Sequence, residues 1–472
     1  MDAVTAARRH AHARRETILG LLATFIGYPT VSAEPHRAGD MTACAAWLAR
    51  LLRRIGLAEV RVSPGRVAPV VTAAWRGRPG QPTLLVYGHY DVQPTGPRQS
   101  WSTGPFRATR VGSYLHARGA SDDKGQLMAH LAAIEAWLAT SGRLPLNLTV
   151  VLDGEEEIGS PTLLTAVRRG WAPLTADAAL VSDTWMLAPD SPVVISGLRG
   201  AIRARLEVSG PRADLHAGSF GGAVANPAHA LAWLVAGLHE KSGRVAVMGF
   251  YDGVRPLSGA ERARLARTAP SDARLLAPAG EAAGHGEPGF SAFERVTRRP
   301  ALVVTDVSTS SGGRTVVPAW AAADLNVRLA AGQEPGTIAR ALRRHIQARV
   351  PAGVRARLLV SDTCPPYTLD PSAPVIRGVR AACRTVFGRD PVLLPSGGSI
   401  PFVSTLAAAG GIHVMLLGFG LPADRVHAPN ERLYLPNLFR GTDACIELYQ
   451  QLAGELARRP TPRGGRGRQG TT

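Results

Sequence analysis

Two patterns of apolar and polar positions alternate along residues 1–198. Short, nearly continuous apolar runs end in polar residues at 83–91, 146–157 and 177–183, which is typical of parallel strands buried on both faces. Between the first two runs, apolar residues recur at helical spacing, namely Leu127, Leu131, Ile134 and Leu138. The alternation predicts an α/β domain with a mostly parallel sheet flanked by helices.

The pattern changes near residues 197–200. Residues 201–210 alternate between apolar and charged, which predicts a strand with one face in water. The elements expected after it are a helix at 227–239, strands at 301–308 and 319–330, a helix at 336–349 and a strand at 353–361. This β-α-β-β-α-β order is ferredoxin-like. After about residue 370 the first pattern returns, with helices at 373–387, 400–409 and 434–457 and a buried strand at 412–419.

These patterns predict a discontinuous domain with a second domain inserted into it. Residues 1–198 and 371–457 form the first, and residues 199–370 form the inserted ferredoxin-like α+β domain. The last segment, 458–472, is basic and rich in glycine and proline, and is predicted to be a disordered tail.

Composition narrows the cellular setting. No apolar run reaches the ~20 residues of a membrane span. Residues 18–27 superficially resemble a secretory signal, but Glu16 stands at their edge and no cleavage site follows, so a first helix is favoured over export. The four cysteines show no C-x-x-C spacing, which favours reduced thiols in a cytoplasmic protein.

The formal net charge is +18, which raises the question of nucleic acid. The basic residues are almost all arginines scattered along the chain, because Lys124 and Lys241 are the two lysines. No basic platform interleaved with aromatic residues appears, so a nucleic-acid partner is not expected.

Candidate chemistry gathers where the apolar runs end, which is where α/β sheets place their sites. His89 and Asp91 are two residues apart and point to one face of a strand. A zinc-binding histidine usually donates its other ring N–H to a carboxylate. Taken alone, the pair is better explained as an ordinary strand-end hydrogen bond.

Several acidic residues are further candidates. Asp122, in RGASDDKGQ, opens a helix, and helix capping would also explain it. DGEEEIGS (153–160) places three carboxylates in a row, which is either a solvated acidic turn or a metal site. Asp183 and His427 are unremarkable singly. Together, mixed histidine and carboxylate ligands indicate a pair of zinc ions bridged by one acid.

The motifs GHYDVQP, RGASDDKGQ, DGEEEIGS, SDTW, LRG, DLHAGSFGG, GGSIP and HAPNE occur in this order between about residues 20 and 455. In this arrangement the chain resembles the carnosinase-type zinc dipeptidases of the aminoacylase and carboxypeptidase superfamily. The resemblance implies a homodimer in which the inserted domain serves as lid and dimerisation domain. It also implies a cis bond between Asp122 and Asp123.

The resemblance assigns roles to individual residues. Two Zn²⁺ ions are expected, Asp122 bridging both, with His89 and Asp183 at one and Glu157 and His427 at the other. Glu156 is the expected general base for a water held by both metals, and Asp91 orients His89. In the inserted domain the residues implied are His216, which stabilises the oxyanion in the partner subunit's site, Thr315, which also reaches across, and Arg328, which binds the substrate carboxylate. Gly398 and Ser399, in GGSIP, are expected to contact the same carboxylate.

The expected function is hydrolysis of dipeptides or similar small amides with a free carboxylate. An N-acyl or N-carbamoyl amino acid amidohydrolase is the alternative on the same site, and an inactive metal-binding scaffold is a third possibility. Mn²⁺ or Co²⁺ could replace zinc, since carboxylate-rich sites accept several divalent ions. The segment TCPPY (363–367) lacks a histidine found in some eukaryotic relatives, so a carnosine-like preference does not follow.

Overall fold

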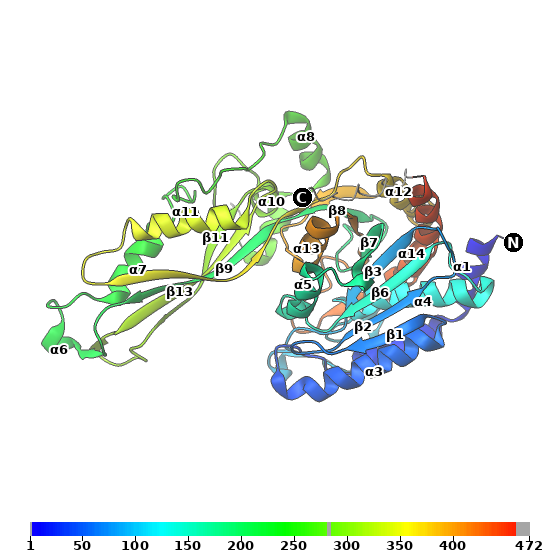
Figure 1. Ribbon diagram of the computed structural model, residues 1–472, viewed down its shortest axis with the longest axis horizontal. Coiled ribbons are helices and arrows are strands. Elements are labelled where there is room, and N and C mark those ends of the chain that lie inside the picture. The colour runs from blue at the N-terminus through cyan, green and yellow to red at the C-terminus, as the bar shows by residue number, and fades with distance from the viewer. Residues whose placement is uncertain (1, 281–284, 459–472) are drawn as a thin grey trace, which may run out of the picture. The chain divides into compact units, whose positions relative to one another are not determined.

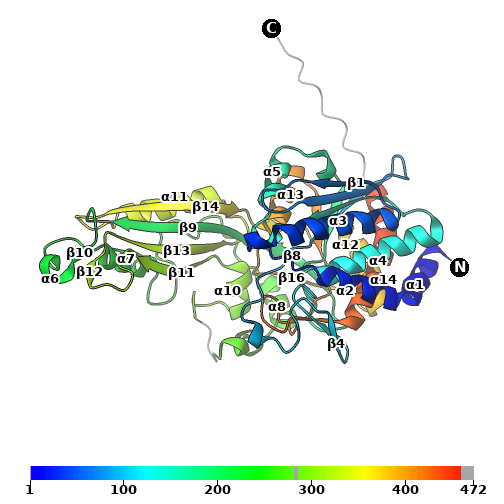
Figure 2. The ribbon, with the colours of Figure 1, turned by 90° about the horizontal axis from the view of Figure 1, so that it is seen from below.

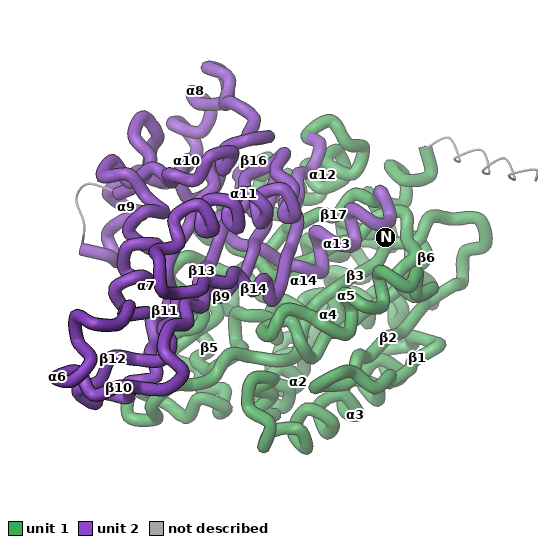
Figure 3. Tube along the Cα trace, turned by 60° about the vertical axis from the view of Figure 1, so that its left-hand side comes forward, with its two compact units in different colours: residues 1–193, 371–391, 412–472 green, residues 194–370, 392–411 purple. Residues whose placement is uncertain are grey.

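The computed structural model describes residues 2–280 and 285–458. It divides into two compact units, coloured separately in Figure 3. Val194–Asp370 and Val392–Gly411 form the second unit, and the remaining described residues form the first. The predicted tail at 458–472 lies, apart from Arg458, outside the described residues.

The first unit is built on a six-stranded sheet in the order β1-β2-β6-β3-β7-β17 (Figure 1). Strands β6, β3, β7 and β17 are parallel, whereas β2 and β1 join antiparallel at one edge. The strands of this unit are β1 (Ala58–Ser63), β2 (Val70–Trp75), β3 (Thr83–His89), β4 (Thr109–Val111), β5 (Tyr114–His116), β6 (Asn147–Asp153), β7 (Ala178–Val181), β17 (His413–Leu416) and β18 (Arg432–Tyr434). The mostly parallel sheet predicted from the apolar runs is confirmed.

Helices flank this sheet. They are α1 (Ala3–Ala13), α2 (Arg15–Ile26), α3 (Ala38–Arg54), α4 (Lys124–Ser141), α5 (Pro161–Arg168), α12 (Pro374–Phe387) and α14 (Leu435–Ala457). Helix α3 packs against β1 and β2, and α4 packs against β3. Helix α4 is buried along most of its length because α1, α2 and α14 cover it as well. That position explains why so few of its residues are polar.

The second unit contains a four-stranded antiparallel sheet in the order β11-β13-β9-β14 (Figure 2). Its strands are β8 (Val193–Leu198), β9 (Gly200–Ser209), β10 (Leu215–His216), β11 (Ala301–Thr309), β12 (Val316–Val317), β13 (Trp320–Leu329), β14 (Arg355–Cys364), β15 (Tyr367–Thr368) and β16 (Val392–Pro395). Its helices are α6 (Ala217–Phe220), α7 (Pro227–Ala236), α8 (Gly259–Thr268), α9 (Asp272–Leu276), α10 (Ala292–Arg298), α11 (Pro335–Gln347) and α13 (Pro401–Gly410). The predicted ferredoxin-like order of elements is confirmed.

Burial in β9 alternates along the strand, because one face of the sheet carries α7 and α11 and the other does not. Residues 392–411, which the sequence analysis placed with the first domain, belong to the second unit. The physical reason is β16, which joins β8 and β15 in a small sheet of that unit.

Candidate metal centre

The candidate site lies at the carboxyl ends of β3, β6 and β7. In the sheet β3 lies between the other two, so the chain forms β6 on one side of β3 and then forms β7 on the other side. Ligand sites of α/β sheets form at such a reversal of strand order. His89 is the last residue of β3, Glu156 and Glu157 follow β6, and Asp183 follows β7.

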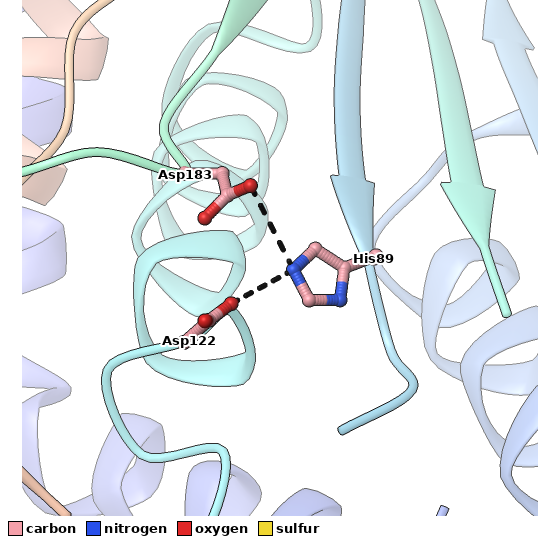
Figure 4. A group of neighbouring side chains, drawn as sticks. All are labelled: His89, Asp122 and Asp183. Carbon is pink, nitrogen blue, oxygen red and sulfur yellow. Dashed lines mark hydrogen bonds and ion pairs between the residues drawn. The ribbon is translucent and has the colours of Figure 1, made fainter. Parts of the chain in front are cut away.

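Two groups of side chains share Asp122. His89 Nε2 lies 3.0 Å from Asp122 Oδ1 and 3.9 Å from Asp183 Oδ2 (Figure 4). His427 Nε2 lies 2.9 Å from Asp122 Oδ2 and 3.3 Å from Glu157 Oε2. Within each group the possible ligand atoms are all within 4.8 Å of one another. Each oxygen of the Asp122 carboxylate therefore faces a different group.

Asp91 links His89 to the segment after β6. The ring Nδ1 of His89 lies 3.1 Å from the backbone oxygen of Asp91 and 3.4 Å from its Oδ1. The carboxylate of Asp91 accepts hydrogen bonds from the hydroxyl of Ser32 and from the backbone N–H groups of Glu156 and Glu157. Because Nδ1 faces acceptors, it would keep its proton when a cation binds, and the lone pair of Nε2, which faces Asp122 and Asp183, would then be available as a ligand.

Glu431 holds the loop that presents Asp122, and the sequence analysis did not identify it. Its buried carboxylate accepts hydrogen bonds from the backbone N–H groups of Gly119, Ser121 and Asp122 and from the guanidinium of Arg118. The available signal was an acidic residue four positions after His427 in HAPNER. The peptide bond between Asp122 and Asp123 is cis, as the resemblance implied.

The electrostatics of the cluster indicate a deficit of positive charge. Burial raises the pKa of Asp183 well above its usual range and that of Glu156 to about 8. Hydrogen bonds to Asp122 and Glu157 raise the pKa of His427 to about 10. Oε1 of Glu157 is buried and has no hydrogen-bond partner among the residues that the structure describes. Divalent cations would relieve the repulsion and occupy the orphaned oxygen, so these residues fit a metal pair.

The other predicted site residues lie in the second unit, where they form two groups. His216 ends β10, which pairs with β12, so it lies beside Thr315. On β13, Arg328 donates to the Ser399 hydroxyl at 2.9 Å, and that hydroxyl donates to the backbone oxygen of Arg199. Gly398 accepts from the backbone N–H of Arg199. The functional roles of these residues stay predictions.

Comparison with known proteins gives a consistent result. The family model described as peptidase family M20/M25/M40 matches residues 85–451. The Cys-Gly metallodipeptidase of Schizosaccharomyces pombe is 30% identical over 86% of this chain and 86% of its own length. The Beta-Ala-His dipeptidase of Rattus norvegicus is 27% identical over 82% of this chain and 80% of its own.

Solved structures agree with the sequence relatives. The dipeptidase Dug1p of Saccharomyces cerevisiae has a TM-score of 0.83 at 25% identity, covering 96% of this chain and 99% of that one. A family M20 metallo-carboxypeptidase of Sulfolobus solfataricus has a TM-score of 0.82 at 28% identity, covering 92% and 99%. Among the described residues, no helix is long and apolar enough to cross a membrane.

Proposed function

Because this chain belongs to peptidase family M20/M25/M40, we propose that it is a two-zinc dipeptidase that hydrolyses dipeptides or similar small amides with a free carboxylate. The observation that carries the proposal is the pair of ligand groups sharing Asp122, with Glu156 next to them in the chain. His89 and Asp183 would hold one ion, and Glu157 and His427 the other. The names of the relatives support a dipeptide as the substrate.

The chemistry needs a Lewis acid and a base. Bound zinc would lower the pKa of water and polarise the scissile carbonyl. Glu156 takes a proton from the attacking water as the new C–O bond forms, and it passes that proton to the amine as the C–N bond breaks. Burial raises the pKa of Glu156, so its carboxylate, when ionised, is a stronger proton acceptor than an exposed one. Asp91 keeps His89 in the tautomer that presents Nε2.

Residues of the second unit are proposed to bind the substrate. Arg328, with Ser399 and Gly398, holds the free carboxylate, and the hydrogen bond from Arg328 to Ser399 keeps the guanidinium in place for it. His216, with Thr315, stabilises the oxyanion in the neighbouring subunit of a homodimer. The cytoplasm is the proposed location, which suits four buried and unpaired cysteines.

The substrate class is tested with metal-reconstituted enzyme on dipeptides, N-acetyl amino acids and N-carbamoyl amino acids. We expect kcat/KM to be highest for dipeptides, with two metal ions bound per chain. Faster turnover of the acylated amino acids would replace the dipeptidase with a deacylase on the same site.

Sharing of His216 is tested by mixing two inactive variants, His216→Ala and Glu156→Gln. After random exchange of equal amounts, about half of the dimers are mixed, and one of the two sites in each mixed dimer is complete. About a quarter of the wild-type activity should therefore return. A mixture that stays inactive, although exchange of labelled subunits is observed, would place His216 in the site of its own chain.

A further inference from the structure

A second feature of the first unit adjoins the metal centre. A cavity of about 360 Å³ is bordered by Asp122 and Asp183. The rest of its lining combines apolar side chains, including Trp185, Leu421, Pro422 and Val426, with the polar side chains of Ser121, Gln126, Thr184 and Arg425. A substrate whose scissile carbonyl lies at the metals brings the neighbouring side chain on the carbonyl side within reach of this cavity. The lining should therefore influence which residue is accepted there.

Two polar side chains of the lining, Ser121 and Gln126, are already engaged, whereas the buried Thr184 hydroxyl has no hydrogen-bond partner among the described residues. The Ser121 hydroxyl donates to Asp424, and the Gln126 amide donates to the backbone oxygen of Ser121. The amide oxygen of Gln126 accepts from the backbone N–H groups of Phe419 and Gly420. These groups hold the loop 418–426 against the start of α4 and have little capacity left for a ligand.

Arg425 is different. It is exposed, it lines the cavity, and its guanidinium makes no ion pair or hydrogen bond with any residue that the structure describes. Its backbone has a φ of 60°, so this position of the loop adopts a left-handed conformation although it is not glycine. The cavity thus has an unpaired cation with five N–H donors.

The nearby aspartates do not use this cation. Neither Asp122 nor Asp183 pairs with Arg425, and both face histidines instead. Once cations compensate those two carboxylates, an incoming anion meets the guanidinium without a competing acid in the described lining. The hydrogen bond that forms is charge-assisted, and such a bond is stronger than one between neutral groups.

We propose that Arg425 is a specificity-determining residue, which selects substrates whose residue on the carbonyl side of the scissile bond is aspartate or glutamate. This inference rests on the proposed function and names the substrate class of that same site. The carboxylate of that side chain accepts from the guanidinium of Arg425, and its methylene groups lie against the apolar walls.

The test compares isosteric substrates that differ only in charge. With metal-reconstituted enzyme, kcat/KM is measured for Asp-Ala and Asn-Ala, with Ala-Ala as reference. We expect Asp-Ala to exceed Asn-Ala by about tenfold, which is typical of a hydrogen bond between charged groups. In Arg425→Gln the ratio falls to near one, and in Arg425→Lys part of it returns because the charge is kept.

Arg169→Gln is the matched control, because Arg169 is exposed, makes no ion pair with the described residues and does not line this cavity. It should keep the wild-type ratio. Equal kcat/KM for Asp-Ala and Asn-Ala in the wild type, or an unchanged ratio in Arg425→Gln, would overturn the inference and leave the dipeptidase intact. If no dipeptide is cleaved while an acylated amino acid is, the proposed function itself fails.

Discussion

Two buried histidines of the first unit differ sharply in their surroundings. His89 belongs to an acidic cluster with Asp122, Asp183, Glu157 and His427. His130, on α4, belongs to a neutral network, which comprises His130, Ser182, Cys445 and Tyr449. Ser182 and Asp183 are consecutive in the chain after β7, so a single step along the backbone separates the two environments.

Both ring nitrogens of His130 find hydrogen-bond partners within the neutral network. The Ser182 hydroxyl donates its proton to the backbone oxygen of Leu417, so it must accept from Nε2–H of His130. Nδ1 of His130 then accepts from the Tyr449 hydroxyl. Burial lowers the pKa of His130 to about 3, which keeps the ring neutral.

The acidic cluster contains more carboxylates than histidines, so its charges are not balanced within it. Burial alone would lower the pKa of His89 too, but its hydrogen bonds to Asp122 and Asp91 raise the pKa well above its ordinary value. Burial therefore does not distinguish a structural histidine from a candidate metal ligand. The number of carboxylates facing the ring does, because only their surplus charge calls for a cation.

Removing the shared carboxylate should have the largest effect. We expect Asp122→Asn to lose both metal ions and at least roughly 10⁴-fold in kcat/KM, since the Lewis acid and the activated water are lost together. Metal per chain, measured by elemental analysis, and steady-state kinetics check this. His130→Gln is the contrasting variant and should keep its metals; if it loses them as well, the two regions are not independent.

Removing the proposed base should cost less. We expect Glu156→Gln to bind both metals and to lose about 10³-fold in kcat, which is typical for a general base. The neighbour Glu155 has a structural role, because its buried carboxylate accepts from the backbone N–H groups of Val67, Ala68 and Thr162. Glu155→Gln should therefore lower the thermal midpoint and have little effect on kcat. Near-normal turnover of Glu156→Gln with metals bound would remove Glu156 from the mechanism.

Much of this arrangement could be predicted from the sequence. Apolar runs that end in polar residues located β3, β6 and β7, and sheet topology then gathers their ends at one edge. His89 and Asp183 come together for that reason. Local pattern carried this information because a strand buried on both faces must be apolar until it ends.

Other features depend on contacts between segments far apart in the chain. Tyr449 contacts His130 from a helix 319 residues away, and Glu431 fixes the Asp122 loop across 309 residues. No local periodicity encodes such pairs. The pairing of β16 with β8 was missed for the same reason, and so residues 392–411 were assigned to the first domain.

Metal removal tests the charge argument without a mutation. A ligand present at 100 times its Kd stabilises the folded state by about 2.7 kcal/mol, so chelation should lower the thermal midpoint of the first unit by roughly 5–10 °C. Calorimetry with and without chelator measures this shift. His130→Gln should show the same shift and Asp122→Asn almost none. An unchanged midpoint in the wild type would mean that the acidic cluster is stable without cations.

The smallest effect should come from the neutral network and should depend on pH. The pKa of His130 is about 3 in the folded state and near 6.5 when unfolded, so the unfolded chain binds a proton first as the pH falls. The stabilisation is complete above pH 6.5 and is lost progressively toward pH 3. Between pH 7.5 and 5.5 the wild type should lose about 1.4 kcal/mol more unfolding free energy than His130→Gln.

Glutamine suits this comparison because it can both donate to Ser182 and accept from Tyr449, yet it has no proton to gain. Denaturant unfolding of both proteins at the two pH values measures the difference, and titrations of the acidic cluster cancel because both proteins contain it. A wild type that loses no more than the variant would show that His130 titrates normally in the folded state. Burial without carboxylates would then not keep a histidine neutral in this fold, and the contrast with His89 would have to rest on geometry alone.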